Sequence, residues 1–184
     1  MCSSDLNQVL DLAKIEAGRF DWQIAAVDMR AVAEDAVAAV GRLFKDKNVA
    51  LETNLPDGLA PVLADRDQLM QVIVNLLSNA VKFSPAGAGR VMLEARSFAN
   101  FVEMRVIDNG PGVAPENQQI IFEKFRQVLE RPPARPAGSG LGLPISRRII
   151  EHFGGRIWVE SAPGRGAVFG FVVPRAEAGL AAAQ

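Results

Sequence analysis

Apolar residues recur at helical spacing in some stretches of the chain and alternate with polar residues in others. The helical spacing predicts helices over residues 29–45, 65–83 and 143–153, and a shorter one near 115–125. Alternation, or a short apolar run between turn residues, predicts strands over 20–27, 49–55, 90–99, 101–108, 156–161 and 167–173. Because the two kinds of element do not alternate strictly, the sequence predicts an α+β fold in which a layer of helices covers one face of a mixed sheet.

Residues 1–18 carry a pattern of their own. Leu6, Leu10, Ala13 and Ala17 recur at alternating four- and three-residue steps, which is the spacing of a seam against a partner helix, and Gly18 ends the pattern. A helix this short is marginal alone. It is therefore interpreted as the end of a longer helix or as a dimerisation stub, and the alternative is an N-terminal helix that packs on its own domain.

Composition narrows the class of protein. The chain has 184 residues and a formal net charge of -1, which favours one domain with a short appendage and argues against a nucleic-acid binder held by phosphate contacts. A single cysteine and a single histidine, Cys2 and His152, exclude a disulfide framework, a cysteine zinc site and a multi-histidine metal site. Without a secretory signal or a long apolar run, we expect a cytoplasmic fragment with no membrane contact.

The helix expected over residues 65–83 has an unusual polar side. Its apolar face is expected to comprise Leu69, Val72, Ile73, Leu76, Leu77, Ala80 and Phe83. The remaining narrow stripe consists of Gln68, Gln71, Asn75, Ser78, Asn79 and Lys82. A solvated stripe is typically rich in Glu and Lys, whereas asparagine is a mediocre helix former, so the stripe indicates a site.

The chemistry of this stripe suits a metal–nucleotide surface. An asparagine oxygen is a suitable ligand for Mg²⁺, and a lysine ammonium is a donor for phosphate. One asparagine oxygen would hold Mg²⁺ only weakly unless phosphate oxygens completed its shell. The alternative is a solvent-facing stripe that happens to contain amides.

Three glycine clusters follow. Asp108-Asn-Gly-Pro-Gly112 comes after an alternating strand, where the carboxylate could accept a hydrogen bond from the amino group of adenine and the glycines could approach a flat base; a bare turn is the alternative. Gly138-Ser-Gly-Leu-Gly-Leu143 opens a helix and could bind an anion, or could be a flexible loop and cap. Gly164-Arg-Gly166 fits an ordinary hairpin turn.

Taken in order, these segments resemble the catalytic, ATP-binding domain of bacterial sensor histidine kinases, within the superfamily of gyrase, the ninety-kilodalton heat-shock chaperones and the mismatch-repair ATPases. Residues 75–83 resemble the N box, Phe122-Glu-Lys-Phe125 the F box, and the three glycine clusters the three glycine boxes. Residues 6–18 resemble the end of the second helix of the dimerisation and phosphoacceptor domain. The resemblance divides the chain into that helix end (1–18), an ATP-binding domain (19–175) and a disordered tail (176–184).

The resemblance implies a two-layer α/β sandwich that binds Mg²⁺ and ATP beneath a mobile lid, residues 126–139. It implies that Asn79 supplies the Mg²⁺ oxygen, Asn75 and Lys82 contact phosphates or order the site, and Gln71 orients the acceptor imidazole. Asp108 would read the adenine amino group. The other implied ATP-binding residues are Gly110, Gly112, Phe122, Phe125, Gly138, Ser139, Gly140, Leu141, Gly142, Leu143 and Gly166.

The resemblance also implies a function and partners. The expected reaction is transfer of the ATP γ-phosphate to a histidine on a dimerisation domain, in a homodimeric parent protein, with a response-regulator receiver domain as the next acceptor. His152 belongs to the helix after the second glycine box and does not replace that histidine, so we expect no self-phosphorylation. Ala167 stands where relatives often have Thr or Ser. The alternatives are an ATP-hydrolysing clamp, which would want a carboxylate on the amide stripe, and a non-enzymatic dimerisation module.

Overall fold

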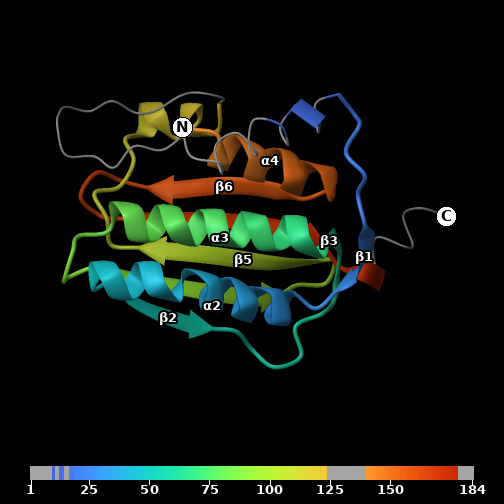
Figure 1. The fold of residues 1–184 in the computed structure, drawn as a ribbon, viewed down its shortest axis with the longest axis horizontal. Helices are drawn as coiled ribbons and strands as arrows, with labels where there is room; N and C mark the ends of the chain where they lie inside the picture. Colours follow the sequence, from blue (N-terminus) through green and yellow to red (C-terminus); the bar gives the residue numbers. More distant parts are fainter. Residues whose placement is uncertain (1–9, 11–12, 15–16, 124–139, 178–184) are drawn as a thin grey trace.

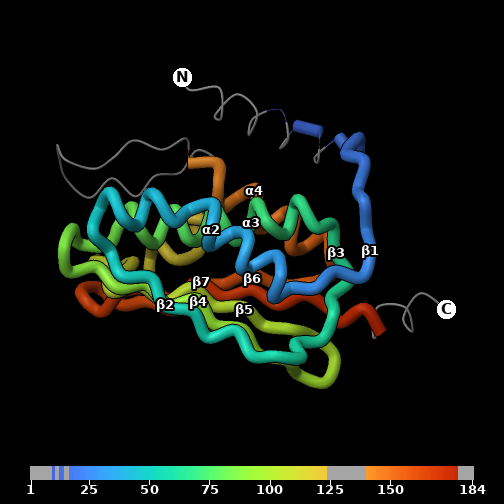
Figure 2. The backbone as a smooth tube through the Cα atoms, turned by 60° about the horizontal axis from the view of Figure 1, so that its bottom comes forward, coloured from blue at the N-terminus to red at the C-terminus, as the bar shows by residue number. Residues whose placement is uncertain are grey.

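Helices cover one face of a five-stranded sheet in the computed structural model, which describes residues 10, 13–14, 17–123 and 140–177 (Figure 1). In chain order the elements are β1 (Ile24–Val27), α2 (Met29–Lys47), β2 (Ala50–Asn54), β3 (Val62–Asp65), α3 (Arg66–Phe83), β4 (Arg90–Ser97), β5 (Phe101–Asp108), η1 (Pro115–Asn117), η2 (Ile120–Phe122), α4 (Gly142–His152), β6 (Arg156–Ser161) and β7 (Ala167–Pro174). The sheet order is β2-β4-β5-β7-β6, with β2 parallel to β4 and the other neighbours antiparallel. Figure 2 shows α2, α3 and α4 on the same side of this sheet, which confirms the predicted mixed sheet with helices on one face.

Aspartates begin the two long helices. The carboxylate of Asp28 accepts hydrogen bonds from the N–H groups of Arg30 and Ala31 at the start of α2, as its N-cap position in the sequence predicts. The carboxylate of Asp65 does the same for the first turn of α3. α2 ends at Lys47 and is capped by Asn48, whose φ of 53° is left-handed. The helix is therefore a little longer than the sequence predicts.

A second, two-stranded sheet pairs β1 with β3 in antiparallel register, from Ile24 opposite Asp65 to Val27 opposite Val62. The sequence did not predict β3, and it predicted a longer first strand over residues 20–27. The ladder stops at Ile24 because its partner stops at Asp65, where the chain turns into α3.

The apolar face of α3 is the centre of the core. The buried residues of this helix are Leu69, Val72, Ile73, Leu76, Leu77, Ala80 and Val81. The prediction that Phe83 belongs to this face is wrong, since Phe83 is 42% exposed while Val81 is 5% exposed. Helical periodicity shows to which side of the helix a residue points, but it does not show how far along the helix the core extends. Phe83 is the last residue of the helix, where its side chain stays exposed although the periodicity assigns it to the apolar side.

The expected short helix near residues 115–125 is wrong as far as the structure describes it. Two separate 3₁₀ turns stand there instead, η1 over residues 115–117 and η2 over residues 120–122. Their backbone hydrogen bonds span three residues, as from the N–H of Gln118 to the carbonyl of Pro115. Residues 124–139, including Phe125, Gly138, Ser139 and the expected lid, lie outside the described residues.

The structure describes only part of the two segments predicted at the ends of the chain. Ala13 and Ala17 are joined by a helical hydrogen bond, and Gly18 ends that turn with a φ of 62°. The remainder of the expected N-terminal helix lies outside the described residues, as do residues 178–184. Ala176 is buried, and its N–H donates to the carbonyl of Pro61.

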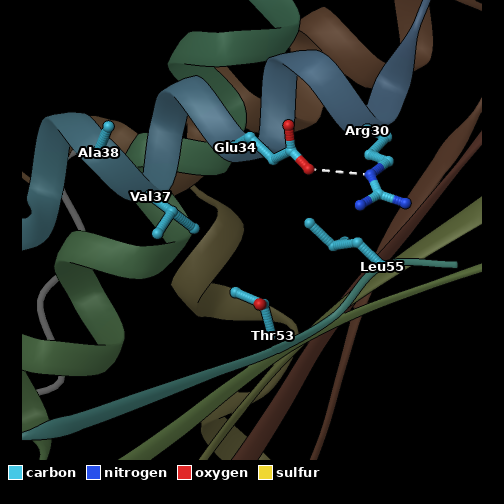
Figure 3. A pocket seen from close by; sticks show the side chains of 6 residues that line it. All are labelled: Arg30, Glu34, Val37, Ala38, Thr53 and Leu55. Carbon is cyan, nitrogen blue, oxygen red and sulfur yellow. Dashed lines mark hydrogen bonds and ion pairs between the residues drawn. The ribbon is translucent and has the colours of Figure 1, made fainter. Parts of the chain in front are cut away.

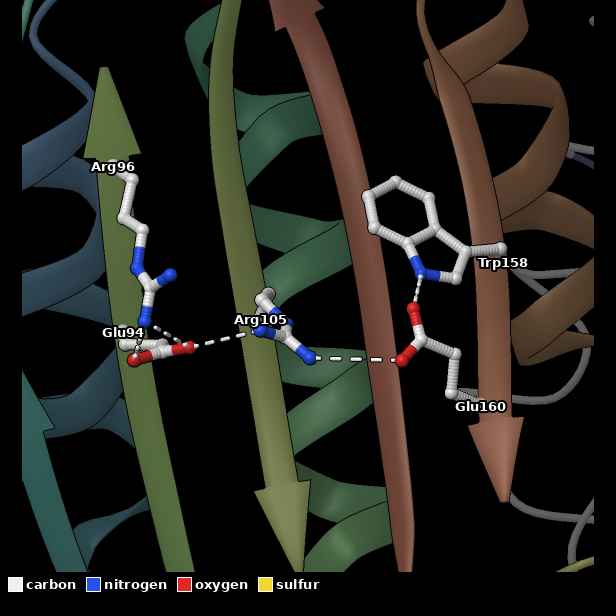
Figure 4. A network of polar contacts seen from close by, with 5 residues as sticks. All are labelled: Glu94, Arg96, Arg105, Trp158 and Glu160. Carbon is white, nitrogen blue, oxygen red and sulfur yellow. Dashed lines mark hydrogen bonds and ion pairs between the residues drawn. The ribbon is translucent and has the colours of Figure 1, made fainter. Parts of the chain in front are cut away.

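The sheet face opposite the helices carries a chain of polar contacts (Figure 4). The Glu94 side chain is only 7% exposed and is paired with Arg96 at 3.2 Å and with Arg105 at 3.4 Å. Arg105 also lies 3.7 Å from Glu160, which accepts a hydrogen bond from the indole of Trp158. These pairs satisfy charges that lie on the sheet itself. None of the helices within the described ranges combines the length and apolar character that crossing a membrane requires.

Candidate functional site

The polar stripe of α3 is half-buried along its whole length. Each of its six side chains has intermediate exposure, and the oxygen of Gln68 is buried with no hydrogen-bond partner among the described residues. The helix is held at both ends, because Asp65 caps its start and the ammonium of Lys47 donates to the carbonyls of Val81 and Lys82 near its end. The stripe is therefore a half-buried surface on a helix that is held in place at both ends. An ordinary solvent-facing helix side would be more exposed.

Asn75 joins α3 to the glycine-rich start of α4. Its side-chain nitrogen donates a hydrogen bond of 2.8 Å to the hydroxyl of Ser146, which is 1% exposed. A Cβ atom added to Gly142 would overlap the Asn75 carboxamide, standing 2.8 Å from its Cγ atom. A glycine is therefore required there for close helix packing. The sequence did not single out Ser146, and nothing in its local pattern marks it.

Asn79 and Lys82, the next polar positions along the stripe, are not engaged in this way. Within the described part of the chain, neither side chain has a hydrogen-bond or ion-pair partner. Burial lowers the pKa of the Lys82 ammonium, which lies 5.2 Å from the centre of the exposed Phe83 ring. Gln71 is likewise half-buried without a partner among these residues. The three polar groups are available to a ligand.

Asp108 lies at the end of β5 and is 8% exposed. Burial raises the pKa of its carboxyl, while hydrogen bonds from the N–H groups of Gly110 and Ala167 act in the opposite direction. The bond from Gly110 is 2.8 Å long, so the carboxylate is held in one orientation by its own loop. Ala167 contributes here through its backbone, which the absence of a hydroxyl at that position does not affect.

The first and third glycine clusters pack against each other. Gly112 and Gly166 have φ values of 76° and 73°. A Cβ atom on Gly112 would stand 2.8 Å from the carbonyl carbon of Ala162, and one on Gly166 would stand 3.0 Å from that of Asp108. The interpretation of Gly164-Arg-Gly166 as a hairpin turn is thus incomplete, because this turn also supports the loop after Asp108.

Two polar side chains that the sequence did not single out hold these loops together. The hydroxyl of Ser161 accepts a hydrogen bond from the N–H of Val113 and donates one to the carbonyl of Gly166. The side chain of Gln118 donates to the carbonyls of Val113 and Ser161. Isolated polar residues of this kind leave no periodic signal, so only the tertiary structure reveals them.

The second glycine cluster is described from Gly140 onward. Gly140 has a φ of 69°, Leu141 is 1% exposed, and Gly142 is the first residue of α4, followed by the half-buried Leu143. Phe122 is buried in the core at η2, which packs against α4. The structure thus brings the second glycine cluster to α3 and brings the first cluster to the third.

His152 has a structural setting. It is the last residue of α4, and its ring stacks on Trp22 with centroids 3.9 Å apart. Burial lowers the pKa of its imidazole. The structural interpretation of this histidine fits these contacts.

A hollow of about 440 Å³ lies elsewhere, between α2 and β2 (Figure 3). It is lined by Arg30, Glu34, Val37, Ala38, Thr53 and Leu55. None of the residues expected to bind a ligand lines it, and the guanidinium of Arg30 is already paired with Glu34 at 2.8 Å. This hollow is not the candidate site.

The oxygen atoms that the site offers fit a metal ion that binds together with a larger molecule. Among residues 17–123 and 140–177 and the three described residues before them, no cluster of three His, Cys, Asp or Glu side chains could hold a metal ion. The oxygen of Asn79, which has no partner in the part of the chain that the structure describes, offers one hard ligand, and a divalent cation would need its other oxygens from the bound molecule.

The amino-acid sequence of this chain is similar to those of known proteins. Residues 64–177 match the model of the family described as "Histidine kinase-, DNA gyrase B-, and HSP90-like ATPase". The chain is 37% identical over 164 residues to the adaptive-response sensory kinase SasA of Parasynechococcus marenigrum (strain WH8102), covering 87% of this chain and 43% of SasA. It is 39% identical over 166 residues to the virulence sensor protein BvgS of Bordetella bronchiseptica, covering 88% of this chain and 13% of BvgS. The chain therefore spans less than half the length of these relatives.

Solved structures show the same fold. The crystal structure of full-length ShkA in complex with AMPPNP superposes with a TM-score of 0.82 at 33% sequence identity, over 94% of this chain and 35% of ShkA. The mycobacterial sensor histidine kinase MprB superposes with a TM-score of 0.68 at 28% identity, over 83% of this chain and 97% of that structure.

Proposed function

Because this chain belongs to the histidine kinase-, DNA gyrase B- and HSP90-like ATPase family, we propose that it is the ATP-binding catalytic domain of a two-component sensor histidine kinase. The observation that carries this proposal is the half-buried amide surface of α3. On this surface Asn79 and Lys82 are unpartnered among the described residues, and Asn75 contacts Gly142 and Ser146 of α4. The similarity to the sensory kinase SasA and to the sensor histidine kinase MprB supports the kinase assignment within the family, and the ShkA structure in complex with AMPPNP supports a nucleotide as the ligand.

The proposed reaction moves the γ-phosphoryl group of ATP to an imidazole nitrogen of a histidine on a dimerisation domain. The new N–P bond replaces the bond between the γ-phosphorus and the β–γ bridging oxygen, and ADP leaves with the electron pair of that bond. Such transfers depend mainly on positioning and charge neutralisation. Mg²⁺, when bound with ATP, would neutralise phosphate charge and fix the geometry of the phosphate oxygens.

Three side chains of the stripe, together with the end of β5 and the loop after it, have proposed tasks in that reaction. Asn79 would give its oxygen to the metal, and the ammonium of Lys82 would hold a phosphate oxygen. Gln71 would orient the acceptor imidazole, since an amide can donate or accept a hydrogen bond but cannot act as a strong base. Asp108 would accept a hydrogen bond from the adenine amino group, and Gly112 would allow the base to lie close to the backbone. An adenine would therefore be favoured over a guanine, which carries a carbonyl at that position.

The acceptor would lie on another domain, since the only histidine of this sequence is stacked on Trp22 at the far end of α4. We propose that residues 1–18 end the second helix of a dimerisation and phosphoacceptor domain, that the parent is a homodimer, and that a response-regulator receiver domain takes the phosphate next. This domain would act in the cytoplasm, and another part of the full-length parent protein could be anchored in a membrane.

A transfer experiment tests the proposal. The chain is mixed with a histidine kinase dimerisation domain and ATP labelled at the γ-phosphate, with Asn79→Ala as the inactive variant. The expected result is acid-labile phosphohistidine on the added domain, lost with Asn79→Ala. Release of inorganic phosphate without phosphohistidine would favour the clamp-type ATPase, and stable label on His152 would contradict the assignment.

A further inference from the structure

Ser146 is a polar residue among the otherwise apolar buried residues of α4. It is 1% exposed and lies between the buried Ile145 and the turn that carries Ile149 and Ile150, where an alanine would pack without needing a partner. Buried hydroxyl groups are normally hydrogen-bonded, and the partner here is Asn75, across the helix–helix contact. The hydroxyl therefore has a tertiary role, beyond its place in the helix.

Both ends of the Asn75 carboxamide are used in this contact. Its nitrogen donates to Ser146 at 2.8 Å, and the rest of the group fills the space that a side chain at Gly142 would need. Gly142 and Ser146 are four residues apart on α4 and so lie on the same face of that helix. Asn75 thus contacts α4 at two successive turns.

Asn79 is one turn further along α3 and has no such contact among the described residues. The two asparagines of the stripe are chemically identical, yet their surroundings differ. A carboxamide already committed to α4 is poorly placed to bind a ligand, whereas the unpartnered one is well placed.

We propose that Ser146 is a positioning residue of the nucleotide site, and that Asn75 acts with it to hold the glycine-rich start of α4 against α3 while Asn79 alone binds the metal. This inference rests on the proposed function and deepens it. It assigns different tasks to two asparagines that the sequence places in a single stripe.

Binding of AMPPNP in the presence of Mg²⁺ or of EDTA separates the two tasks. Ser146→Ala removes one buried hydrogen bond and is expected to weaken binding by about fivefold in both conditions, leaving the Mg²⁺/EDTA affinity ratio unchanged. Asn79→Ala is expected to bring that ratio close to one. The double variant Asn75→Ala/Ser146→Ala should bind no more weakly than Asn75→Ala, because both changes break the same contact.

Matched variants identify the hydroxyl as the cause. Ser146→Thr keeps the hydroxyl and should bind as the unmodified chain does. Ser97→Ala removes a hydroxyl that accepts a hydrogen bond from the N–H of Ala60, far from α4, and should leave binding unchanged. Ser146→Ala binding as tightly as the unmodified chain, or losing the Mg²⁺ dependence, would overturn the proposal.

Hydrogen exchange measured without nucleotide tests the positioning role of Ser146 independently of the proposed function. Ser146→Ala should speed exchange of the backbone amides in residues 140–146, and Ser97→Ala should not. If the unmodified chain bound no nucleotide, the proposed function would fail, while this exchange result would still decide whether Ser146 positions α4. Unchanged exchange in Ser146→Ala would refute the positioning role.

Discussion

Asp108 illustrates how a single buried charge can favour function over stability. Its pKa is raised because burial disfavours the ionised carboxylate, although two backbone N–H groups hold it in place. A group whose pKa is higher in the folded chain stabilises the fold at low pH, and that contribution is lost as the pH rises through the folded pKa. The carboxylate should therefore weaken the fold at neutral pH, and in the proposed site it would give the adenine amino group a strong acceptor.

The variant Asp108→Asn separates the two effects. An amide does not ionise, so the melting temperature of this variant, relative to that of the unmodified chain, should rise between about pH 4 and pH 7. Its affinity for ATP should fall, because an amide is a weaker acceptor than a carboxylate. Thermal unfolding and calorimetry at both pH values check the two effects, with Asp21→Asn at an exposed position as control. A relative stability that does not change with pH would contradict this explanation.

At the scale of elements, the site depends on how closely α3 and α4 approach each other. Gly142 allows that approach because its Cα faces the Asn75 carboxamide, and its φ is not left-handed, so conformational freedom is not the reason for the glycine. Gly41 in α2 is a useful contrast. A Cβ atom there would meet nothing within 4 Å.

Alanine substitutions at these two glycines should have opposite signs. Gly41→Ala should raise the free energy of unfolding by about 0.5–1 kcal/mol, because alanine is the better helix former. Gly142→Ala should lower it by about 1–3 kcal/mol through overlap with Asn75, and should weaken ATP binding. Urea unfolding measures both. Equal stabilisation by the two substitutions would show that the close contact between α3 and α4 is not required.

At the scale of the whole molecule, the segment that leads into the domain touches the far ends of both site helices. The N–H of Gln23 donates to the carboxylate of Asp65, which also caps α3. Trp22 stacks on His152 at the end of α4 and meets the edge of the Phe153 ring. Residues 22 and 23 thus attach the segment before β1 to α3 and α4, the two helices that carry the site.

Acid should weaken this attachment. The pKa of His152 is lowered by burial, so the stability that neutral His152 contributes is present above its unfolded pKa, near 6.5, and is lost as the pH falls through the folded pKa. His152→Phe keeps a stacked ring without a titrating group. Its melting temperature should therefore fall less between about pH 7.5 and pH 5 than that of the unmodified chain. An equal fall in both would show that His152 does not contribute to this pH dependence.

Most of the architecture could be predicted from the sequence because periodicity reports burial directly. Helices 29–47, 66–83 and 142–152 and all five strands of the main sheet follow such patterns. The strand β3 has four residues and no pattern of its own, and it exists because β1 pairs with it. Phe83 was assigned wrongly because direction around a helix does not show where its neighbours end.

The site was predictable only in part. Glycines and amides stand out in a sequence because they break local propensity, which is why the sequence singles out Asn79 and Gly142, while Asp108 is singled out by the glycine cluster that follows it. Ser146, Ser161 and Gln118 are single polar residues whose partners are distant along the chain, so their roles follow from tertiary contacts alone. The division of tasks that we propose for Asn75 and Asn79 likewise rests on the contacts of Asn75 with α4.

The most direct test of the account is calorimetric titration of Mg-ATP into the unmodified chain and into Asn79→Ala, with GTP and EDTA as comparisons. We expect one ATP bound per chain, weaker binding of GTP and of ATP in EDTA, and loss of the Mg²⁺ effect in Asn79→Ala. No detectable binding of Mg-ATP, or binding that Asn79→Ala leaves unchanged, would contradict a nucleotide site on the amide side of α3.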